Sequence, residues 1–113
     1  MDCLFCKIIN GEIGSKKVYE DENVYAFYDI NPVAPVHVIV VPKAHIESAN
    51  EITDENSYVI ANVFSAIPKI AEILNIKQDG YRVITNIGKN GGQTIKHIHF
   101  HIIGGTNLGE KLI

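Results

Sequence analysis

Apolar and polar residues change their spacing along this chain, and each change predicts a different element. Two short apolar runs flank an Asp-Glu-Asn turn, which predicts strands over residues 17–20 and 24–28. Residues 36–41 are β-branched at nearly every position, which is typical of a strand covered on both faces. Pro32 and Pro35 predict an irregular loop before that strand, because proline fixes its own backbone and restricts the preceding residue.

Two other segments are predicted to be helical. From Thr53 onward, apolar residues recur at three- and four-residue steps, which predicts one long amphipathic helix with an N-terminus near Thr53. The apolar positions are Ile60, Val63, Phe64, Ile67, Ile70, Ala71 and Leu74. Pro68 lies inside this pattern, so we expect a kink or a break there. A short helix is predicted over residues 3–10, capped by Asp2 and ended by Gly11.

The last third of the chain predicts two more strands. They cover residues 81–86 and 94–103, with a turn at Gly80 and a glycine-rich turn at residues 88–92. Strands joined by short turns are usually antiparallel. The expected fold is therefore α+β, a five-stranded antiparallel sheet with one short N-terminal helix and one long central helix. No repeat or linker divides the chain, so we expect a single domain over residues 1–113.

Composition excludes several classes of protein. Hydrophobic residues make up 46% of the chain and charged residues 20%, which is ordinary for a soluble globular protein. The net charge is −3 and the basic residues are scattered, so no general nucleic-acid binding is expected, because that binding depends on phosphate neutralisation. The sequence shows neither a signal-peptide pattern nor an apolar run that could cross a bilayer. We therefore expect a cytoplasmic protein with no membrane partner.

The segment His-Ile-His-Phe-His-Ile at residues 97–102 is the most informative part of the chain. Side chains alternate between the two faces of a strand, so His97, His99 and His101 should share one face at steps of about 6.5–7 Å. Imidazoles are poor core material because both ring nitrogens need partners. Three interpretations stay open: a polar surface strand, a metal site, and three rings around one phosphate with one histidine attacking phosphorus.

The glycine-rich turn before this segment favours an anion site. Gly88, Gly91 and Gly92 permit close backbone approach, and exposed N–H groups in such turns can bind phosphate. Gln93 and Thr94 follow with an amide and a hydroxyl. A plain hairpin turn would also favour glycine, so the turn alone does not decide between a phosphate site and a structural role.

Residues 91–103 resemble the signature of the histidine triad (HIT) proteins, which is His-x-His-x-His followed by two apolar residues and preceded by Gly-Gly-Gln-Ser or a similar run. The most similar branch is the Hint type, the nucleoside phosphoramidases. The resemblance covers about residues 2–105, because other segments follow the family's order and spacing. These segments are Cys3-x-x-Cys6-Lys7-Ile8-Ile9, Gly11-Glu12-Ile13, Ala26-Phe27-Tyr28-Asp29-Ile30, and Pro35-Val36-His37 through Pro42-Lys43-x-His45-Ile46.

The resemblance implies an enzyme that cleaves purine nucleoside phosphoramidates through a nucleotidyl-histidine intermediate on His99. His101, Thr94 and His37 complete the implied catalytic set. Asp29 would bind the ribose hydroxyls. The implied nucleotide-binding residues are Ile13, Phe27 and Ile30 around the base, and Asn86, Gly92, Gln93, Thr94, His99 and His101 near the phosphate. A homodimer whose two sheets join into one is implied as well.

The resemblance also supports a metal site. Cys3 and Cys6 are three residues apart at a helix start, so their sulfurs can converge, and zinc prefers four nitrogen or sulfur ligands. His45 and His97 can complete the set, and zinc-bearing HIT proteins use equivalent positions. We therefore expect a structural zinc ion on these four residues and no organic cofactor. The alternative is a pair of free, partly buried thiols.

Two departures from the family pattern concern the substrate. Thr94 stands where serine is commoner, and it keeps the hydroxyl. The sequence ends without the Trp-Pro-Pro segment of the animal Hint proteins, so the leaving group is not predicted. Three alternative functions stay open: a dinucleoside polyphosphate hydrolase as in the Fhit branch, a non-catalytic nucleotide-binding or partner-binding adaptor, and a catalytic metal site built from the triad.

Overall fold

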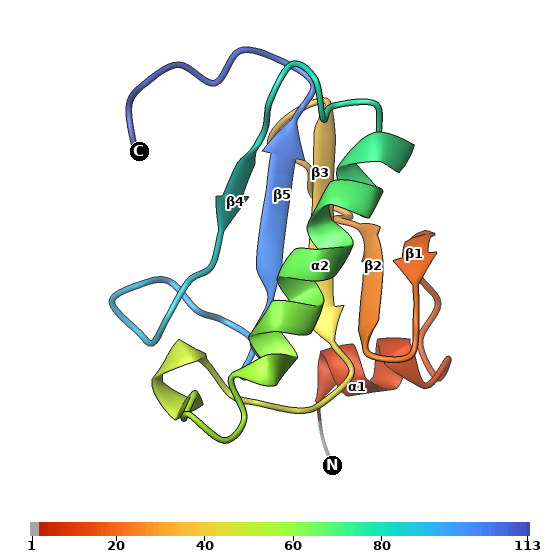
Figure 1. The fold of residues 1–113 in the computed structure, drawn as a ribbon, viewed down its shortest axis with the longest axis vertical. Helices are drawn as coiled ribbons and strands as arrows, with labels where there is room; N and C mark the ends of the chain where they lie inside the picture. The colour runs from red at the N-terminus through yellow and green to blue at the C-terminus, as the bar shows by residue number, and fades with distance from the viewer. Residues whose placement is uncertain (1–2) are drawn as a thin grey trace.

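The strand patterns of the sequence come together as one sheet in the computed structural model, which describes residues 3–113 (Figure 1). The strands are β1 (Lys17–Glu20), β2 (Val24–Tyr28), β3 (Val36–Pro42), β4 (Arg82–Ile84) and β5 (Phe100–Gly104). Their order across the sheet is β1-β2-β3-β5-β4, and each neighbouring pair is antiparallel. The predicted α+β fold, with five antiparallel strands, one short helix and one long helix, is confirmed.

Strand β3 lies at the centre of the sheet, and its alternating side chains serve two different cores. Val38 and Val40 pack on the face covered by the long helix α2 (Tyr58–Ile73). Ile39 packs on the opposite face with the apolar residues of the short helix α1 (Leu4–Ile9). Figure 1 shows α2 lying along one face of the sheet and α1 at its lower end. The prediction that this strand is covered on both faces is confirmed.

The packing of β5 decides which way the histidines face. Ile98, Phe100 and Ile102 are buried in the core on the α2 side of the sheet. His99 and His101 therefore project from the opposite side, as the alternation predicts. A register slip of one residue would bury imidazoles in place of these apolar side chains, so the α2 core fixes the orientation of the histidines.

The strand that carries the histidines is shorter than the predicted 94–103. Strand β5 begins directly after His99, so the first two histidines of the motif precede the regular sheet. The chain before β5 bonds elsewhere, since the Ile98 N–H donates to the Ile46 carbonyl at 2.6 Å. The strand predicted over residues 81–86 is shorter as well, and only Arg82–Ile84 pair with β5.

The long helix begins later than predicted and does not break. The side chains of Thr53 and Asn56 each accept a hydrogen bond from the other's backbone N–H, which closes a separate turn, and α2 begins at Tyr58. Pro68 lies inside α2, which continues to Ile73 as one helix. Residues on both sides of the proline are buried against the sheet, and this burial outweighs one lost hydrogen bond. Of the kink or break expected at Pro68, the break does not occur.

Helix α1 begins after Cys3, whose side chain accepts a hydrogen bond from the Cys6 N–H at 3.3 Å. The cap predicted at Asp2 lies outside the described residues. Gly11 follows the helix with a left-handed backbone (φ of 79°), as the predicted helix end requires. A short 3-10 helix, Ala49–Glu51, precedes α2. Within residues 3–113, no helix has both the length and the apolar character needed to cross a membrane.

Candidate active site and metal centre

His99 is held in one orientation at the point where the chain enters β5. Its ring packs edge-on against Phe5 of α1 at a centroid distance of 4.9 Å, and only 7% of the residue is exposed. Its Nδ1 lies 2.8 Å from the carbonyl oxygen of His97. Because a carbonyl oxygen can only accept, Nδ1 carries the ring proton and Nε2 keeps a free electron pair.

Burial keeps the His99 ring neutral. It lowers the pKa of His99 below the usual value of about 6.5, because the imidazolium is poorly solvated there. The hydrogen bond to His97 and the negative charge of Asp29 raise the pKa, but their effect is smaller than that of burial. His99 therefore presents an uncharged, nucleophilic nitrogen near neutral pH.

Two further histidines, His37 and His101, form a hydrogen-bonded chain beside His99. The Val33 N–H donates to Nδ1 of His37 at 3.2 Å, so that nitrogen has no proton and Nε2 carries it. Nε2 of His37 then donates to Nδ1 of His101 at 2.8 Å, and Oδ2 of Asp29 lies 3.3 Å from the same Nε2. Because Nδ1 of His101 accepts this hydrogen bond, the ring proton of His101 lies on its Nε2.

His101 and His99 form a pair with complementary protonation. Their ring centroids are 5.3 Å apart. Burial lowers the pKa of His101, and its proximity to His99 and His37 lowers it further. Both rings are therefore neutral, with a bare Nε2 on His99 and a protonated Nε2 on His101. Such a pair can attack with one ring and donate a proton or hydrogen bond with the other.

Asp29, His37 and His101 also have ligand atoms within 4.8 Å of one another, which is close enough for a metal ion. A metal would need the electron pair on Nε2 of His37, and the ring proton would then move to Nδ1. That nitrogen faces the N–H of Val33, so two donors would point at each other. The geometry favours hydrogen-bonded histidines over a metal ion in this cluster.

Cys3, Cys6, His45 and His97 form a second cluster at the start of α1, with all four ligand atoms within 4.8 Å of one another. Nδ1 of His97 lies 3.4 Å from Sγ of Cys3 and 3.6 Å from Sγ of Cys6. Nδ1 of His45 lies 3.4 Å from Sγ of Cys6 and 3.1 Å from Nδ1 of His97. A tetrahedral zinc site with two sulfur and two nitrogen ligands has edges of about 3.3–3.8 Å. The three nitrogen–sulfur distances fall in this range and the nitrogen–nitrogen distance is slightly shorter. The four residues therefore fit zinc in number and chemistry and approximately in spacing.

His97 belongs to this cysteine cluster, although it lies on the same side of the sheet as the other two histidines. Its ring is fully buried, and its Nε2 donates to the Pro42 carbonyl at 2.9 Å. That bond leaves Nδ1 unprotonated and directed at the thiols, as a metal-bound histidine requires. Of the three rings expected around one phosphate, His97 turns away, and only His99 and His101 remain together.

The glycine-rich turn is closed by its own groups. A side chain at Gly91 would collide with the Ile87 carbonyl oxygen, so only glycine fits there. The Asn86 amide donates to the Gly91 carbonyl at 2.7 Å. The Gln93 amide donates to the Glu47 carbonyl at 2.7 Å and to the carbonyl of residue 95 at 3.0 Å. These bonds hold the turn against the segment that follows β3.

The predicted phosphate-binding residues of this turn differ in what they present to solvent. The Gly92 N–H donates within the turn to the Lys89 carbonyl at 3.1 Å. Both N–H groups of the Gln93 amide are also used, so Gln93 shapes the turn. Thr94 is exposed and comes directly after this hydrogen-bonded turn in the chain.

The residues predicted to surround the base and the ribose are unequally placed. Phe27 is buried in the apolar cluster beneath α1. Ile13 is 38% exposed and Ile30 is 92% exposed. Oδ1 of Asp29 accepts the Asn31 N–H at 2.8 Å, which fixes the carboxylate beside the histidine pair. The structure thus buries one of the three apolar residues and leaves two open to solvent.

Comparison with known proteins identifies the family. The HIT domain family matches residues 10–108, a span that contains all five histidines and the glycine-rich turn. The chain belongs to the HIT family. Among its HIT relatives, the Escherichia coli K12 protein named purine nucleoside phosphoramidase is 41% identical over 111 residues, which cover 98% of this chain and 93% of the relative.

Solved HIT structures share the fold over nearly the whole chain. A HIT family hydrolase from Clostridium thermocellum matches with a TM-score of 0.96 and 47% identity, covering 99% of this chain and 97% of that one. A histidine triad protein from Clostridium difficile matches with a TM-score of 0.94 and 50% identity, covering 98% and 96%. The family resemblance seen in the motifs is therefore confirmed along the entire HIT fold.

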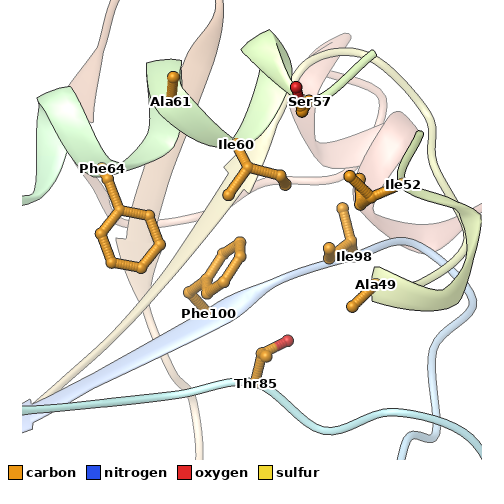
Figure 2. A pocket seen from close by; sticks show the side chains of 9 residues that line it. All are labelled: Ala49, Ile52, Ser57, Ile60, Ala61, Phe64, Thr85, Ile98 and Phe100. Carbon is orange, nitrogen blue, oxygen red and sulfur yellow. The ribbon is translucent and has the colours of Figure 1, made fainter. Parts of the chain in front are cut away.

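An apolar groove of about 440 Å³ lies on the α2 side of the HIT sheet (Figure 2). His99 and His101 project from the other side of the sheet. Phe64 of α2 and Phe100 of β5 meet edge to face within the groove, with ring centroids 5.6 Å apart. Thr85, the residue directly after the edge strand β4, lines one side of the groove. The groove is lined by Ala49, Ile52, Ser57, Ile60, Ala61, Phe64, Thr85, Ile98 and Phe100. This lining offers no acid, base or metal ligand, so the groove is a packing surface.

Several groups that shape the HIT site were not found by sequence reasoning. The Val33 N–H and the Pro42 carbonyl orient two histidine rings, and backbone groups leave no signal in residue type. Phe5, which packs on the His99 ring, has no feature in the sequence that distinguishes it from an ordinary core residue. Thr85 donates from Oγ1 to the His99 carbonyl at 2.7 Å. The sequence indicates Thr85 only by placing a hydroxyl residue directly after the apolar residues of a predicted strand.

Proposed function

We propose that this chain hydrolyses purine nucleoside phosphoramidates through a covalent nucleotidyl-histidine intermediate on His99. The observation that carries the proposal is the hydrogen bond from Nδ1 of His99 to the His97 carbonyl at 2.8 Å. It leaves Nε2 unprotonated on a ring that burial keeps neutral, which is the form of histidine that attacks phosphorus. The phosphoramidase name of the E. coli relative supports the same reaction class.

The first chemical step exchanges one bond to phosphorus for another. The electron pair on Nε2 of His99 forms a bond to the α-phosphorus, and the bond from phosphorus to the leaving nitrogen breaks. The leaving nitrogen takes a proton from solvent and departs as a neutral amine, while Nε2–H of His101 donates a hydrogen bond to a non-bridging phosphate oxygen. Nδ1–H of His99 stays bonded to the His97 carbonyl, which stabilises the positive charge on the substituted ring.

In the second step, water attacks the same phosphorus. The bond to Nε2 of His99 breaks, its electron pair returns to the ring, and the attacking water releases a proton to solvent, while Nε2–H of His101 keeps its hydrogen bond to the phosphate. His37 serves both steps as a positioning residue, because its Nε2–H holds Nδ1 of His101 and so keeps the His101 proton on the outer nitrogen. The proton taken up in the first step is released in the second.

The remaining site residues bind the nucleotide in this proposal. Asp29 accepts hydrogen bonds from the ribose hydroxyls, and the hydroxyl of Thr94 contacts a phosphate oxygen together with His99 and His101. Gln93 holds the turn that presents Thr94. In this proposal Ile13, Phe27 and Ile30 contact the base, and Asn86 and Gly92 contact the phosphate.

Steady-state hydrolysis of adenosine and guanosine phosphoramidates, compared with diadenosine polyphosphates, tests the proposal. The phosphoramidates should be cleaved with the higher kcat/KM. Preference for the polyphosphates would favour the alternative hydrolase instead. A protein that binds nucleoside monophosphate, turns over none of the panel and yields no nucleotidyl adduct on rapid denaturation would be an adaptor.

We also propose a structural zinc ion held by Cys3, Cys6, His45 and His97. The donor set and its spacing support this assignment. Bound there, the ion would cross-link the start of α1 to the segments after β3 and before β5, and it would take no part in the reaction. Thiolate ligands need reducing surroundings, which agrees with a cytoplasmic location for the protein.

We further propose that the HIT chain forms a homodimer through the α2 side of β4. Strand β4 is an edge strand, and Phe64 is 50% exposed in the apolar groove beside it. Pairing β4 with its counterpart in a second copy would give the backbone N–H and C=O groups of this edge hydrogen-bond partners and would cover the groove. The pairing would join the two sheets into one.

The dimer is expected to have about twice the 12.5 kDa mass of the chain in solution. Phe64→Glu should shift the protein to the mass of one chain, because a carboxylate cannot be buried unpaired in an apolar contact. Ile73→Glu is the matched control, since Ile73 is 59% exposed on the same helix but outside the groove. Light scattering after size exclusion measures both, and a Phe64→Glu protein of dimer mass would contradict the arrangement.

The lowered pKa values of His99 and His101 predict the pH dependence of activity. A histidine with a depressed pKa stays neutral to a lower pH than a free one, so kcat/KM should be constant from about pH 8 to about pH 6.5 and fall only below that. A pH profile in a buffer series of constant ionic strength checks this. A loss of kcat/KM on the acid side that is centred above pH 7 would contradict the lowered pKa values of His99 and His101.

A further inference from the structure

We infer that Thr85 is a positioning residue for the nucleophile, acting through the main chain of His99. Oγ1 of Thr85 lies 2.7 Å from the His99 carbonyl oxygen and is the donor, because the carbonyl can only accept. The inference rests on the proposed function, since it assigns a role in the same reaction.

The hydroxyl of Thr85 lies just beyond the last backbone pairing between β4 and β5. Strand β4 ends at Ile84 and β5 begins at Phe100, so Thr85 and His99 both lie just outside the paired residues. A side-chain hydrogen bond of 2.7 Å continues the connection between the two segments by one residue. It thereby restrains the peptide of the residue whose ring must attack phosphorus.

The two restraints on His99 are of different kinds. Its Nδ1–H bond to the His97 carbonyl sets the rotation and tautomer of the ring. The Thr85 bond sets the position of the backbone from which the ring projects. A nucleophile displaced by a fraction of an ångström from its attack geometry reacts much more slowly, so both restraints matter for the chemical step.

Thr85 does not belong to the nucleotide-binding side of the molecule. Its side chain lines the apolar groove, on the α2 side of the sheet, and Figure 2 shows it beside Ile98 and Phe100. The histidine pair projects from the opposite side. The hydroxyl therefore acts on His99 without touching substrate, which predicts an effect on kcat rather than on binding.

Thr85→Val tests the inference, because valine has nearly the same shape and lacks the hydroxyl. We expect kcat for an adenosine phosphoramidate to fall about ten-fold, with KM and the Kd for AMP changed by less than about two-fold. Thr85→Ser restores the donor and should recover kcat to within about two-fold of the wild-type value. Dimer mass is measured in each variant, since the residue also lines the groove.

His99→Ala is the control that separates the role of Thr85 from the proposed function. If His99→Ala is inactive and Thr85→Val has wild-type kcat, the role of Thr85 is overturned and the proposed function stands. If His99→Ala keeps wild-type activity, the proposed function itself fails. A Thr85→Val protein with low kcat that Thr85→Ser does not recover also overturns the inference. Should the valine variant not fold, Thr85→Ala takes its place in the same comparison.

Discussion

Replacing His99 with alanine will abolish phosphoramidate hydrolysis while largely sparing nucleotide binding. We expect kcat to fall by about 10⁴-fold or more, because without Nε2 no bond from protein to phosphorus can form. The Kd for AMP should stay within about ten-fold of the wild-type value, since most of the binding residues are untouched. Steady-state kinetics and calorimetric titration measure the two quantities on the same preparation.

The intermediate offers a direct check on the same assignment. Wild-type protein denatured during turnover should carry the mass of one nucleoside monophosphate on the peptide that contains His99, and His99→Ala should carry none. Lys96→Ala is a suitable control, because Lys96 is an exposed neighbour in the sequence. An adduct on another residue, or near-normal turnover by His99→Ala, would refute the assignment of the nucleophile.

The second large effect concerns zinc. Protein purified without chelator should contain about one zinc ion per chain, and Cys3→Ser should contain none, because three ligands bind far more weakly than four. Since metal binding to such a site is coupled to folding, we expect Cys3→Ser to lower Tm by about 10 °C or more. Elemental analysis and thermal unfolding with and without chelator measure both effects.

Two comparisons separate metal loss from a general weakening of α1. Leu4→Ser changes an exposed residue next to Cys3 and should keep its zinc. Chelator should lower the Tm of the wild type and leave that of Cys3→Ser unchanged, because the variant has no ion to lose. If the wild type holds no metal and chelator has no effect, the four donors are a hydrogen-bonded cluster and the zinc proposal is wrong.

Much of this fold could be predicted because local patterns encode it directly. The β-branched run at residues 36–41 is covered on both faces, as expected, since such a run has no polar side to expose. The alternation in residues 97–102 placed the apolar residues on one side and the histidines on the other. Strand ends were predicted less well, because pairing stops where the chain finds other hydrogen-bond partners, as Ile98 does with Ile46.

The residue types and their order were sufficient to identify the histidines, the cysteine pair and the glycine-rich turn as the chemical parts of the molecule, because these side chains carry their chemistry with them. Only the folded chain decided how the parts are grouped. His97 joins the thiols while His99 joins His101, although all three alternate in one segment. The proton positions on these rings depend on the carbonyls of Pro42 and His97 and on the N–H of Val33. Such backbone groups are present in every sequence, and their effect depends on distances that only packing sets.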